Sequence, residues 1–324
     1  MNDGARKLKK RRPKIAVVGS INMDLVLSCL RLPKPGETLA AEGCREVSGG
    51  KGANQAVAAV RMGSEVSLIG RVGNDVLGSQ LLQQLQESGV GVDRVAKSLD
   101  CSSGLAIVMV EKSGQNSIVI VPGANGKLSP HDIREAASLI QSVDMLVMQL
   151  EVPLATVEEA LLIAKNANVK ILLNPAPAHE VLPESLYQVD ILCSNQTEAE
   201  MLTGIVVDSW DSAQDAASVL MARGAKSVVM TLGKDGACLA ETRHGENYFT
   251  HIASLSVDAV DTTAAGDAFI GALATYVSEF QELSVACRYA CVAGALAATK
   301  FGAQTSLPWR AEVETKTYEN SGSP

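Results

Sequence analysis

Residues 144–178, DMLVMQLEVPLATVEEALLIAKNANVKILLNPAPA, contain two short apolar runs separated by a longer amphipathic segment. The runs at 145–148 and 170–173 have the length and composition of buried strands, whereas the apolar residues between 156 and 167 recur at helical spacing. A strand, a helix and a second strand in this order form a βαβ unit, whose two strands are parallel. This stretch therefore predicts part of a parallel sheet that is covered by helices.

The same alternation extends over most of the 324 residues. It predicts a mainly parallel sheet with helices on both faces, in a body that spans residues 14–312. Further strands are expected at 14–18, 66–72, 191–193 and 227–231, and further helices at 53–62, 76–87, 132–141, from about 197, and at 213–223, 268–280 and 283–299.

Two strand-rich insertions, at about 21–48 and 101–122, interrupt the alternation. In the second, strands at 105–110 and 117–121 are joined across residues 111–116, which include a glycine, as in a β-hairpin. We expect the insertions to form a small antiparallel sheet that covers a site as a lid. The other face of this sheet would be apolar and exposed, which predicts a homodimer through the lid sheets.

Charge and hydropathy argue against two classes of partner. The net charge is −8 although seven of the first 14 residues are Lys or Arg, so the body is acidic and does not favour nucleic acid. No apolar run approaches the roughly 18 residues of a membrane span. For the basic tail, residues 1–13, a nuclear-import signal and a solvated flexible leader both remain open. Residues 313–324 are polar and are expected to be frayed.

The seven cysteines predict free thiols. Their number is odd and no Cys-x-x-Cys occurs, so we expect neither a disulfide framework nor a structural zinc site. Free thiols are typical of a reducing compartment, which favours the cytoplasm.

The stretch Ser48-Gly-Gly-Lys-Gly-Ala-Asn-Gln55 is a candidate binding loop. Its three glycines precede or open a helix and would let the backbone approach a ligand closely, with Lys51 and Asn54 nearby. It lacks the spacing of a nucleotide-binding P-loop. A tight turn into a helix is the alternative interpretation.

The stretch Asp261-Thr-Thr-Ala-Ala-Gly-Asp-Ala-Phe269 is a candidate catalytic segment. If a helix opens here, the N–H groups of Ala264, Ala265 and Gly266 form an anion site. Asp267 would repel a phosphate but could take a proton from an attacking hydroxyl. Otherwise, Asp267 only complements the helix dipole.

Polar residues follow several predicted strands, where α/β sheets bind ligands. Asn195 and Glu198 read as a capping box or as a site near hydrated Mg²⁺. The other candidates are Asn22 and Asp24 as partners of sugar hydroxyls or members of an Asx turn, the turn from Thr231 to Gly236, and Glu151.

Together these motifs resemble the ribokinase / phosphofructokinase-B family of sugar kinases, from about residue 14 to 310. The two family signatures occur in order at 49–55 and 261–267, and Asn22-Met23-Asp24, 174–178 and 302–309 resemble the ribokinase branch. The resemblance implies a three-layer α/β sandwich with a small antiparallel β lid. It also implies transfer of a phosphoryl group from ATP, with Mg²⁺, to the 5-hydroxyl of D-ribose.

The resemblance also assigns roles to residues. It makes Asp267 the general base, Ala264, Ala265 and Gly266 the anion hole, and Glu198 an indirect partner of Mg²⁺. The sugar would be bound by Asn22, Met23, Asp24, Gly50, Lys51, Gly52, Ala53, Asn54, Glu151 and Asp267. ATP would contact Asn195, Thr231, Leu232, Gly233, Lys234, Asp235, Gly236, Gly266, Asp267 and Cys291. A monovalent cation, K⁺, would lie at Asp261, Thr263, Ala297, Lys300, Gly302 and Ser306.

Two departures and two alternatives accompany this resemblance. Ser194 replaces the usual Pro, and Cys291 replaces an Asn or His, so a polar contact to the nucleotide is in doubt. The chain could instead phosphorylate another small sugar or a nucleoside. A non-catalytic sugar- or nucleotide-binding regulator on the same fold is the other alternative.

Overall fold

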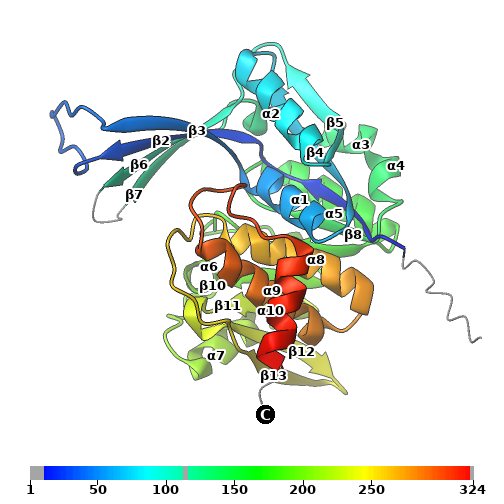
Figure 1. Ribbon diagram of the computed structural model, residues 1–324. Helices are drawn as coiled ribbons and strands as arrows, with labels where there is room; N and C mark the ends of the chain where they lie inside the picture. The colour runs from blue at the N-terminus through cyan, green and yellow to red at the C-terminus, as the bar shows by residue number, and fades with distance from the viewer. Residues whose placement is uncertain (1–10, 112–115, 322–324) are drawn as a thin grey trace, which may run out of the picture.

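The computed structural model describes residues 11–111 and 116–321 and has two sheets (Figure 1). The strands are β1 Lys14–Val18, β2 Asn22–Cys29, β3 Gly43–Gly49, β4 Glu65–Gly73, β5 Gly91–Ser98, β6 Gly104–Glu111, β7 Asn116–Val121, β8 Met145–Met148, β9 Lys170–Leu173, β10 Ile191–Asn195, β11 Ser227–Thr231, β12 Ala237–Arg243 and β13 Glu246–Ile252. The helices are α1 Lys51–Arg61, α2 Val76–Glu87, α3 Pro130–Glu135, α4 Ala137–Ile140, α5 Leu154–Asn166, α6 Gln196–Thr203, α7 Trp210–Ala222, α8 Ala265–Phe280, α9 Leu283–Ala298 and α10 Arg310–Ser321.

The larger sheet forms the centre of the body. Among the described residues its order is β13-β12-β11-β10-β9-β8-β1-β4-β5. Every neighbouring pair from β11 through β5 is parallel, whereas β12 and β13 extend the sheet as antiparallel strands. The predicted parallel sheet is therefore confirmed, with an antiparallel edge.

Helices cover both faces of this sheet. Along β1, Ile15 and Val17 pack into a core with α1, α2, α8 and α9, whereas Ala16 and Val18 pack into a second core with α3 to α7. All four side chains are buried, because consecutive residues of a strand point to opposite faces. The three-layer α/β fold class is confirmed.

The smaller sheet, which we call the lid, has the order β3-β2-β6-β7 and projects from the body (Figure 1). Its β2–β3 and β6–β7 pairs are antiparallel hairpins, and the two hairpins meet through the parallel pair β2–β6. The hairpin pattern did not predict that central parallel pair. Residues 112–115 of the β6–β7 connection lie outside the described residues.

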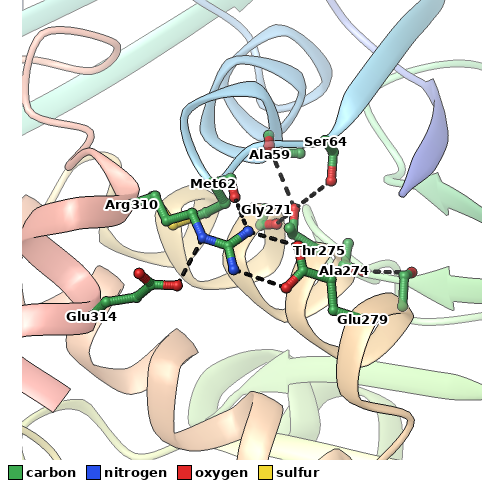
Figure 2. A network of polar contacts seen from close by, with 10 residues as sticks. Ala59, Met62, Ser64, Gly271, Ala274, Thr275, Glu279, Arg310 and Glu314 are labelled. Atoms are coloured by element: carbon green, nitrogen blue, oxygen red, sulfur yellow. Dashed lines mark hydrogen bonds and ion pairs between the residues drawn. The ribbon is translucent and has the colours of Figure 1, made fainter. Parts of the chain in front are cut away.

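The expectation of a frayed C-terminal segment from residue 313 is wrong for residues 313–321, which belong to α10. Figure 2 shows how Arg310 anchors this helix. Its guanidinium forms hydrogen bonds of 2.6 and 2.8 Å to the Glu279 carboxylate, 2.7 Å to Glu314 and 3.0 Å to the Met62 carbonyl. Val313 is fully buried. This helix was missed because it is mostly polar, so its sequence lacks the regular spacing of apolar residues that predicts a helix.

Two further expectations concern the cysteines and the termini. All seven cysteines lie in the described part of the chain and are free, as predicted, and five of them are buried. Residues 1–10 of the basic tail lie outside that part. No helix among the described residues combines the length and the apolar character that a membrane span requires.

Candidate active site

The site lies at one edge of the large sheet, where the parallel strands end. Ser20 follows β1, Glu151 follows β8, Asn174 follows β9, and Thr231 ends β11. Carboxyl ends of parallel strands share an edge, so side chains that are distant in sequence meet there. The N-termini of α1 and α8 bring the two glycine-rich motifs to the same edge.

Helix α1 packs on the end of β1 because two glycines leave room. A Cβ at Gly52 would lie 2.6 Å from the Gly19 carbonyl carbon and 2.6 Å from the Ser20 nitrogen. Gly50, before the helix, has φ of 90°, which favours glycine. This turn places Lys51 and Asn54 beside the strand end, so the tight-turn and ligand-binding interpretations both fit the same stretch.

Asp267 occupies the first turn of α8 and is 6% exposed. Its Oδ2 accepts a hydrogen bond of 2.9 Å from Asn54 Nδ2, and its Oδ1 accepts one of 3.0 Å from Gln55 Nε2. Burial raises the pKa of Asp267, whereas Lys51 and the two amide donors favour its charged form. The carboxylate is thus held from two sides inside the protein.

Lys51 is surrounded by carboxylates. Burial alone would lower its pKa, but the charges of Asp267, Glu151 and Glu198 outweigh burial and raise the pKa of Lys51. Glu151 is fixed in turn, because it accepts hydrogen bonds of 2.5 Å from Ser20 Oγ and 3.2 Å from the Lys51 N–H. The ammonium therefore stays charged next to the candidate base.

Asp24 provides a further buried carboxyl group. Burial, with the charges of Glu151 and Asp267, raises its pKa to about 7. Within the described residues, Asp24 Oδ1 and Asn54 Oδ1 are buried acceptors without a hydrogen-bond partner. Unpaired buried acceptors are costly, and a hydroxyl-rich ligand would supply the missing donors.

Asn22 lies at the start of β2 and is 4% exposed. Its Oδ1 accepts a hydrogen bond of 2.7 Å from Asn125 Nδ2, while the backbone N–H of Ile21 donates to Asn125 Oδ1 over 2.9 Å. Met23 and Ala53, also predicted to contact the sugar, are buried in the hydrophobic core. They contribute packing behind the site.

Two adjoining cavities open beside Asp267. The smaller, about 190 Å³, is lined by Lys51, Asn195, Glu198 and Asp267 among others. The larger, about 620 Å³, is lined by Gly233–Asp235, Gly236 and Cys291 among others. Thr231, Thr262, Gly266 and Phe269 line both, so the two cavities are neighbours. A large cavity that leads to a small one with a carboxylate and an ammonium suits a nucleotide whose phosphates reach the acceptor.

The turn after β11 bounds the larger cavity. Gly236 ends this turn with a φ of 90°. No side chain fits there, because a Cβ would lie 2.0 Å from the Ile252 carbonyl oxygen. The imidazole of His251 lies 2.7 Å from the Asp235 carbonyl oxygen and so braces the turn. Leu232, also predicted to contact ATP, is partly buried and packs against the second core. Burial raises the pKa of Cys291, on the cavity wall, to about 12, so its thiol is neutral.

The N-terminus of α8 has the small residues that an anion site needs. Ala264 is 1% exposed and precedes the helix, and Gly266 lines both cavities. The Ala265 N–H donates to the Thr262 carbonyl over 3.2 Å, so one of the three N–H groups predicted to form the anion hole already has a backbone partner in this structure. The first N–H groups of a helix have no partner within it, and they favour an anion.

The capping box predicted at α6 is present. The Asn195 N–H donates to Glu198 Oε2 over 2.9 Å, and the Glu198 N–H donates to Asn195 Oδ1 over 2.8 Å. Burial raises the pKa of Glu198, although the Asn195 backbone and Lys51 oppose this rise. Glu198 also lines the smaller cavity, so the structural role and a role near phosphates are compatible.

The segments predicted to bind a monovalent cation lie together. Asp261 Oδ1 accepts a hydrogen bond of 3.0 Å from the Thr263 N–H, and its Oδ2 accepts one of 2.9 Å from the Gly302 N–H. Lys300 directs its ammonium to Glu312, 3.0 Å away, and its N–H donates to the Ala297 carbonyl over 3.2 Å. Ser306 Oγ donates to the Ala303 carbonyl over 2.8 Å.

Three residues of the site were not predicted: Gln55, Gln149 and Asn174. Gln149 is fully buried and donates to Gln55, which donates to both Asn174 and Asp267. Gln55 ends the glycine-rich stretch at 48–55, and Asn174 begins the stretch at 174–178. The sequence signal for Gln149 and Asn174 was their position: each is an amide residue directly after a short apolar strand.

Comparisons with known proteins identify the family of this chain. A family model described as "pfkB family carbohydrate kinase" matches residues 12–310. The chain is 42% identical to the ribokinase of Haemophilus influenzae over 93% of this chain and 97% of that protein. It is 40% identical to the deoxyribokinase of Salmonella typhimurium over 91% of this chain and 95% of that protein.

Solved structures give the same result. The structure of Arabidopsis thaliana ribokinase complexed with ribose and ATP superposes with a TM-score of 0.86 at 31% identity, covering 95% of this chain and 99% of that one. A ribokinase from Thermotoga maritima gives a TM-score of 0.85 at 34% identity, covering 95% of this chain and all of that one.

Proposed function

The chain belongs to the pfkB family of carbohydrate kinases, and we propose that it transfers the terminal phosphoryl group of ATP to the 5-hydroxyl of D-ribose. The observation that carries the proposal is the group of buried acceptors beside Asp267. Asp24 Oδ1 and Asn54 Oδ1 have no partner among the described residues. Hydroxyl groups of a small sugar would pair with them and present one hydroxyl to Asp267.

In this proposal the residues divide the work. Asn22, Asp24, Asn54 and Glu151 bind the sugar, and Gly50 and Gly52 let the backbone approach it. Asp267 takes the proton from the attacking hydroxyl: burial raises the pKa of this carboxyl group, which suits a base, while Lys51 and the two amide donors favour its charged form. The N-terminus of α8, from Ala264 to Gly266, stabilises the charge on the phosphoryl group in flight.

ATP fits the larger of the two cavities, with its base near Cys291 and its phosphates toward Gly266. Mg²⁺ fits the smaller one, where the Glu198 carboxylate would bind it through water, and it would neutralise phosphate charge. The neutral Cys291 thiol would offer the base a nonpolar contact where the family resemblance implies a polar one.

K⁺ fits the segments joined by Asp261. Both Asp261 oxygens are occupied by N–H donors and Lys300 directs its ammonium elsewhere, so backbone carbonyls would provide the ligands. Carbonyl ligands suit a large, weakly hydrated cation. The ion would hold residues 261–263, and therefore the start of α8, in place.

The assembly we propose is a homodimer through the lid. Ile118, Val119, Ile120 and Val121 of β7 are each 44–54% exposed. Register places Ile120 on the face of Asp24 and Val119 on the opposite face with Ile107. One face would meet the sugar, and a second copy would cover the other. Free thiols also favour the cytoplasm as the compartment.

The deciding experiment is an ADP-release assay with Mg²⁺-ATP and D-ribose, 2-deoxyribose, fructose and adenosine. We expect the highest kcat/KM with D-ribose. The deoxyribokinase relative makes 2-deoxyribose the second candidate, and preference for it would correct the substrate within the family. Turnover of adenosine without turnover of ribose would reject the proposal, and no turnover of any acceptor would favour a regulator.

A further inference from the structure

Three buried amide side chains lie behind Asp267 and form one hydrogen-bonded chain. Gln149 Nε2 donates to Gln55 Oε1 over 2.6 Å. Gln55 Nε2 then donates to Asp267 Oδ1 over 3.0 Å and to Asn174 Oδ1 over 3.1 Å. Asn174 Nδ2 donates to the Cys193 carbonyl over 3.0 Å. Gln55 is 1% exposed, Gln149 0% and Asn174 8%, so the chain is sheltered from water.

These contacts leave Gln55 one orientation. An amide oxygen only accepts and an amide nitrogen only donates. Because Gln149 donates to the Gln55 oxygen, the Gln55 nitrogen must face Asp267 and Asn174. A flipped amide would place its oxygen against the carboxylate. Gln149 Oε1 lies close to Gly19, where a Cβ would be 2.0 Å away, and has no hydrogen-bond partner among the described residues.

We propose that Gln55 is a positioning residue for the reaction, and that Gln149 and Asn174 act through it. Asn54 binds one Asp267 oxygen and Gln55 the other, so the carboxylate cannot rotate. An ionised carboxylate accepts about four hydrogen bonds, so sites remain for the sugar hydroxyl. This inference rests on the proposed role of Asp267 as the base.

The charges that face Asp267 make Gln55 important. Lys51 from α1 is the cation, and Asp24 from β2, Glu151 after β8 and Glu198 from α6 are the acids. Without the Gln55 donor, Asn54 and Lys51 alone would support the negative charge against burial and three carboxyl groups. The base would then lose its proton only at higher pH.

The experiment compares Gln55→Met and Gln149→Met with the parent chain across pH 5–9. For Gln55→Met we expect kcat to fall about tenfold, with KM for ribose within about twofold, because only the alignment of the base is lost. The acid limb of the kcat profile should move up by about one pH unit, as for loss of one donor to a carboxylate. Gln149→Met should also lower kcat and move the acid limb to higher pH, but by smaller amounts.

Thr275→Val is the matched control. Thr275 Oγ1 on α8 lies 2.8 Å from the Oγ of Ser64, which follows α1 (Figure 2). Neither residue lines the two cavities of the site. This variant should lower the melting temperature without moving the pH profile. If Gln55→Met does not fold, Gln55→Glu keeps the size of the side chain and should also raise the acid limb.

The outcomes distinguish the positioning role of Gln55 from the role of Asp267 as the base. An unchanged kcat and pH profile in folded Gln55→Met would overturn the positioning role, and so would an equal shift in Thr275→Val. In contrast, near-parental turnover of Asp267→Asn would remove the proposed base itself. Loss of turnover in Asp267→Asn together with a shifted profile in Gln55→Met is the result that we expect.

Discussion

Asn54 Nδ2 donates a hydrogen bond of 2.9 Å to Asp267 Oδ2, and this contact joins the two glycine-rich motifs, which are 213 residues apart in sequence. The helices that carry the two residues, α1 and α8, approach closely because Gly271 has no side chain. A Cβ there would lie 2.4 Å from Ala58 Cβ. Small residues at this contact thus set the position of the candidate base.

The first prediction concerns Asp267→Asn. The substitution keeps the shape of the side chain and removes its capacity to take a proton. We expect kcat to fall at least about 10²-fold, the scale of losing a general base. Calorimetry should still detect ribose binding, because Asn22, Asp24 and Glu151 are intact. A folded variant with near-parental kcat would contradict the assignment.

Much of the fold could be predicted because its signals are local. The strands of the parallel sheet are short apolar runs, and the predicted α2 and β11 have the observed bounds. Helix α10 could not be predicted, because its anchor is the Arg310–Glu279 ion pair between distant residues. The same holds for the parallel β2–β6 pair, which depends on how two separate hairpins meet.

The candidate site, like the fold, could be predicted from the sequence only in part. Family motifs indicated Asp267, Lys51 and Asn54, since glycine-rich stretches are visible in sequence. Gln149 could not be recognised, because its role depends on a contact with Gln55 that only the packing of α1 on the sheet creates. Raised pKa values such as that of Asp24 also follow from burial, which a motif does not reveal.

Asp24→Asn should change how stability depends on pH. Burial first, and then Glu151 and Asp267, raise the pKa of Asp24 to about 7 in the folded chain, whereas the unfolded value is 3.8. The folded state therefore binds the proton more tightly, and ionisation of Asp24 costs stability as pH rises from 4 to 7. The Asp24→Asn variant avoids this cost, because an amide has no charge that burial would desolvate.

We expect the ligand-free Asp24→Asn chain to melt about 3 °C above the parent at pH 8, with little difference at pH 4. Ribose affinity should fall, because an acceptor for a sugar hydroxyl is lost. Calorimetric scans at both pH values check this. Equal melting temperatures at pH 8 would show that Asp24 is not strained in the empty site.

Gly52→Ala should separate α1 from β1. The added methyl group would lie 2.6 Å from backbone atoms of Gly19 and Ser20, which cannot yield as a flexible side chain can. We expect a loss of stability of about 1–3 kcal/mol, the usual cost of overpacking, together with a large drop in kcat/KM. Gly43→Ala is the control, since a Cβ there meets nothing within 4 Å. Similar urea midpoints for both variants would refute the argument.

Val119→Lys should dissociate the proposed dimer. Val119 is 54% exposed and lies on the lid face opposite Asp24. A buried lysine without a partner would be costly at an interface, so the mass from light scattering should fall from about twice 33.9 kDa to that of one chain. Val206→Lys, at another exposed valine, should leave the mass unchanged. A parental chain that is monomeric at micromolar concentration would refute the lid dimer.

The last prediction is activation by K⁺. A bound ion would tie residues 261–263 to the loop around Gly302 and so fix the N–H groups at the start of α8, whose preorganisation stabilises the phosphoryl group. At saturating Mg²⁺-ATP and ribose, with ionic strength held constant by a bulky organic cation, kcat should rise with K⁺ and saturate, and Na⁺ should act less well. Asp261→Asn should shift the K⁺ midpoint upward, because an amide cannot accept from both the Thr263 and the Gly302 N–H groups. A flat response to K⁺ would remove the cation site and leave the kinase assignment unaffected, because the sugar and nucleotide contacts do not pass through it.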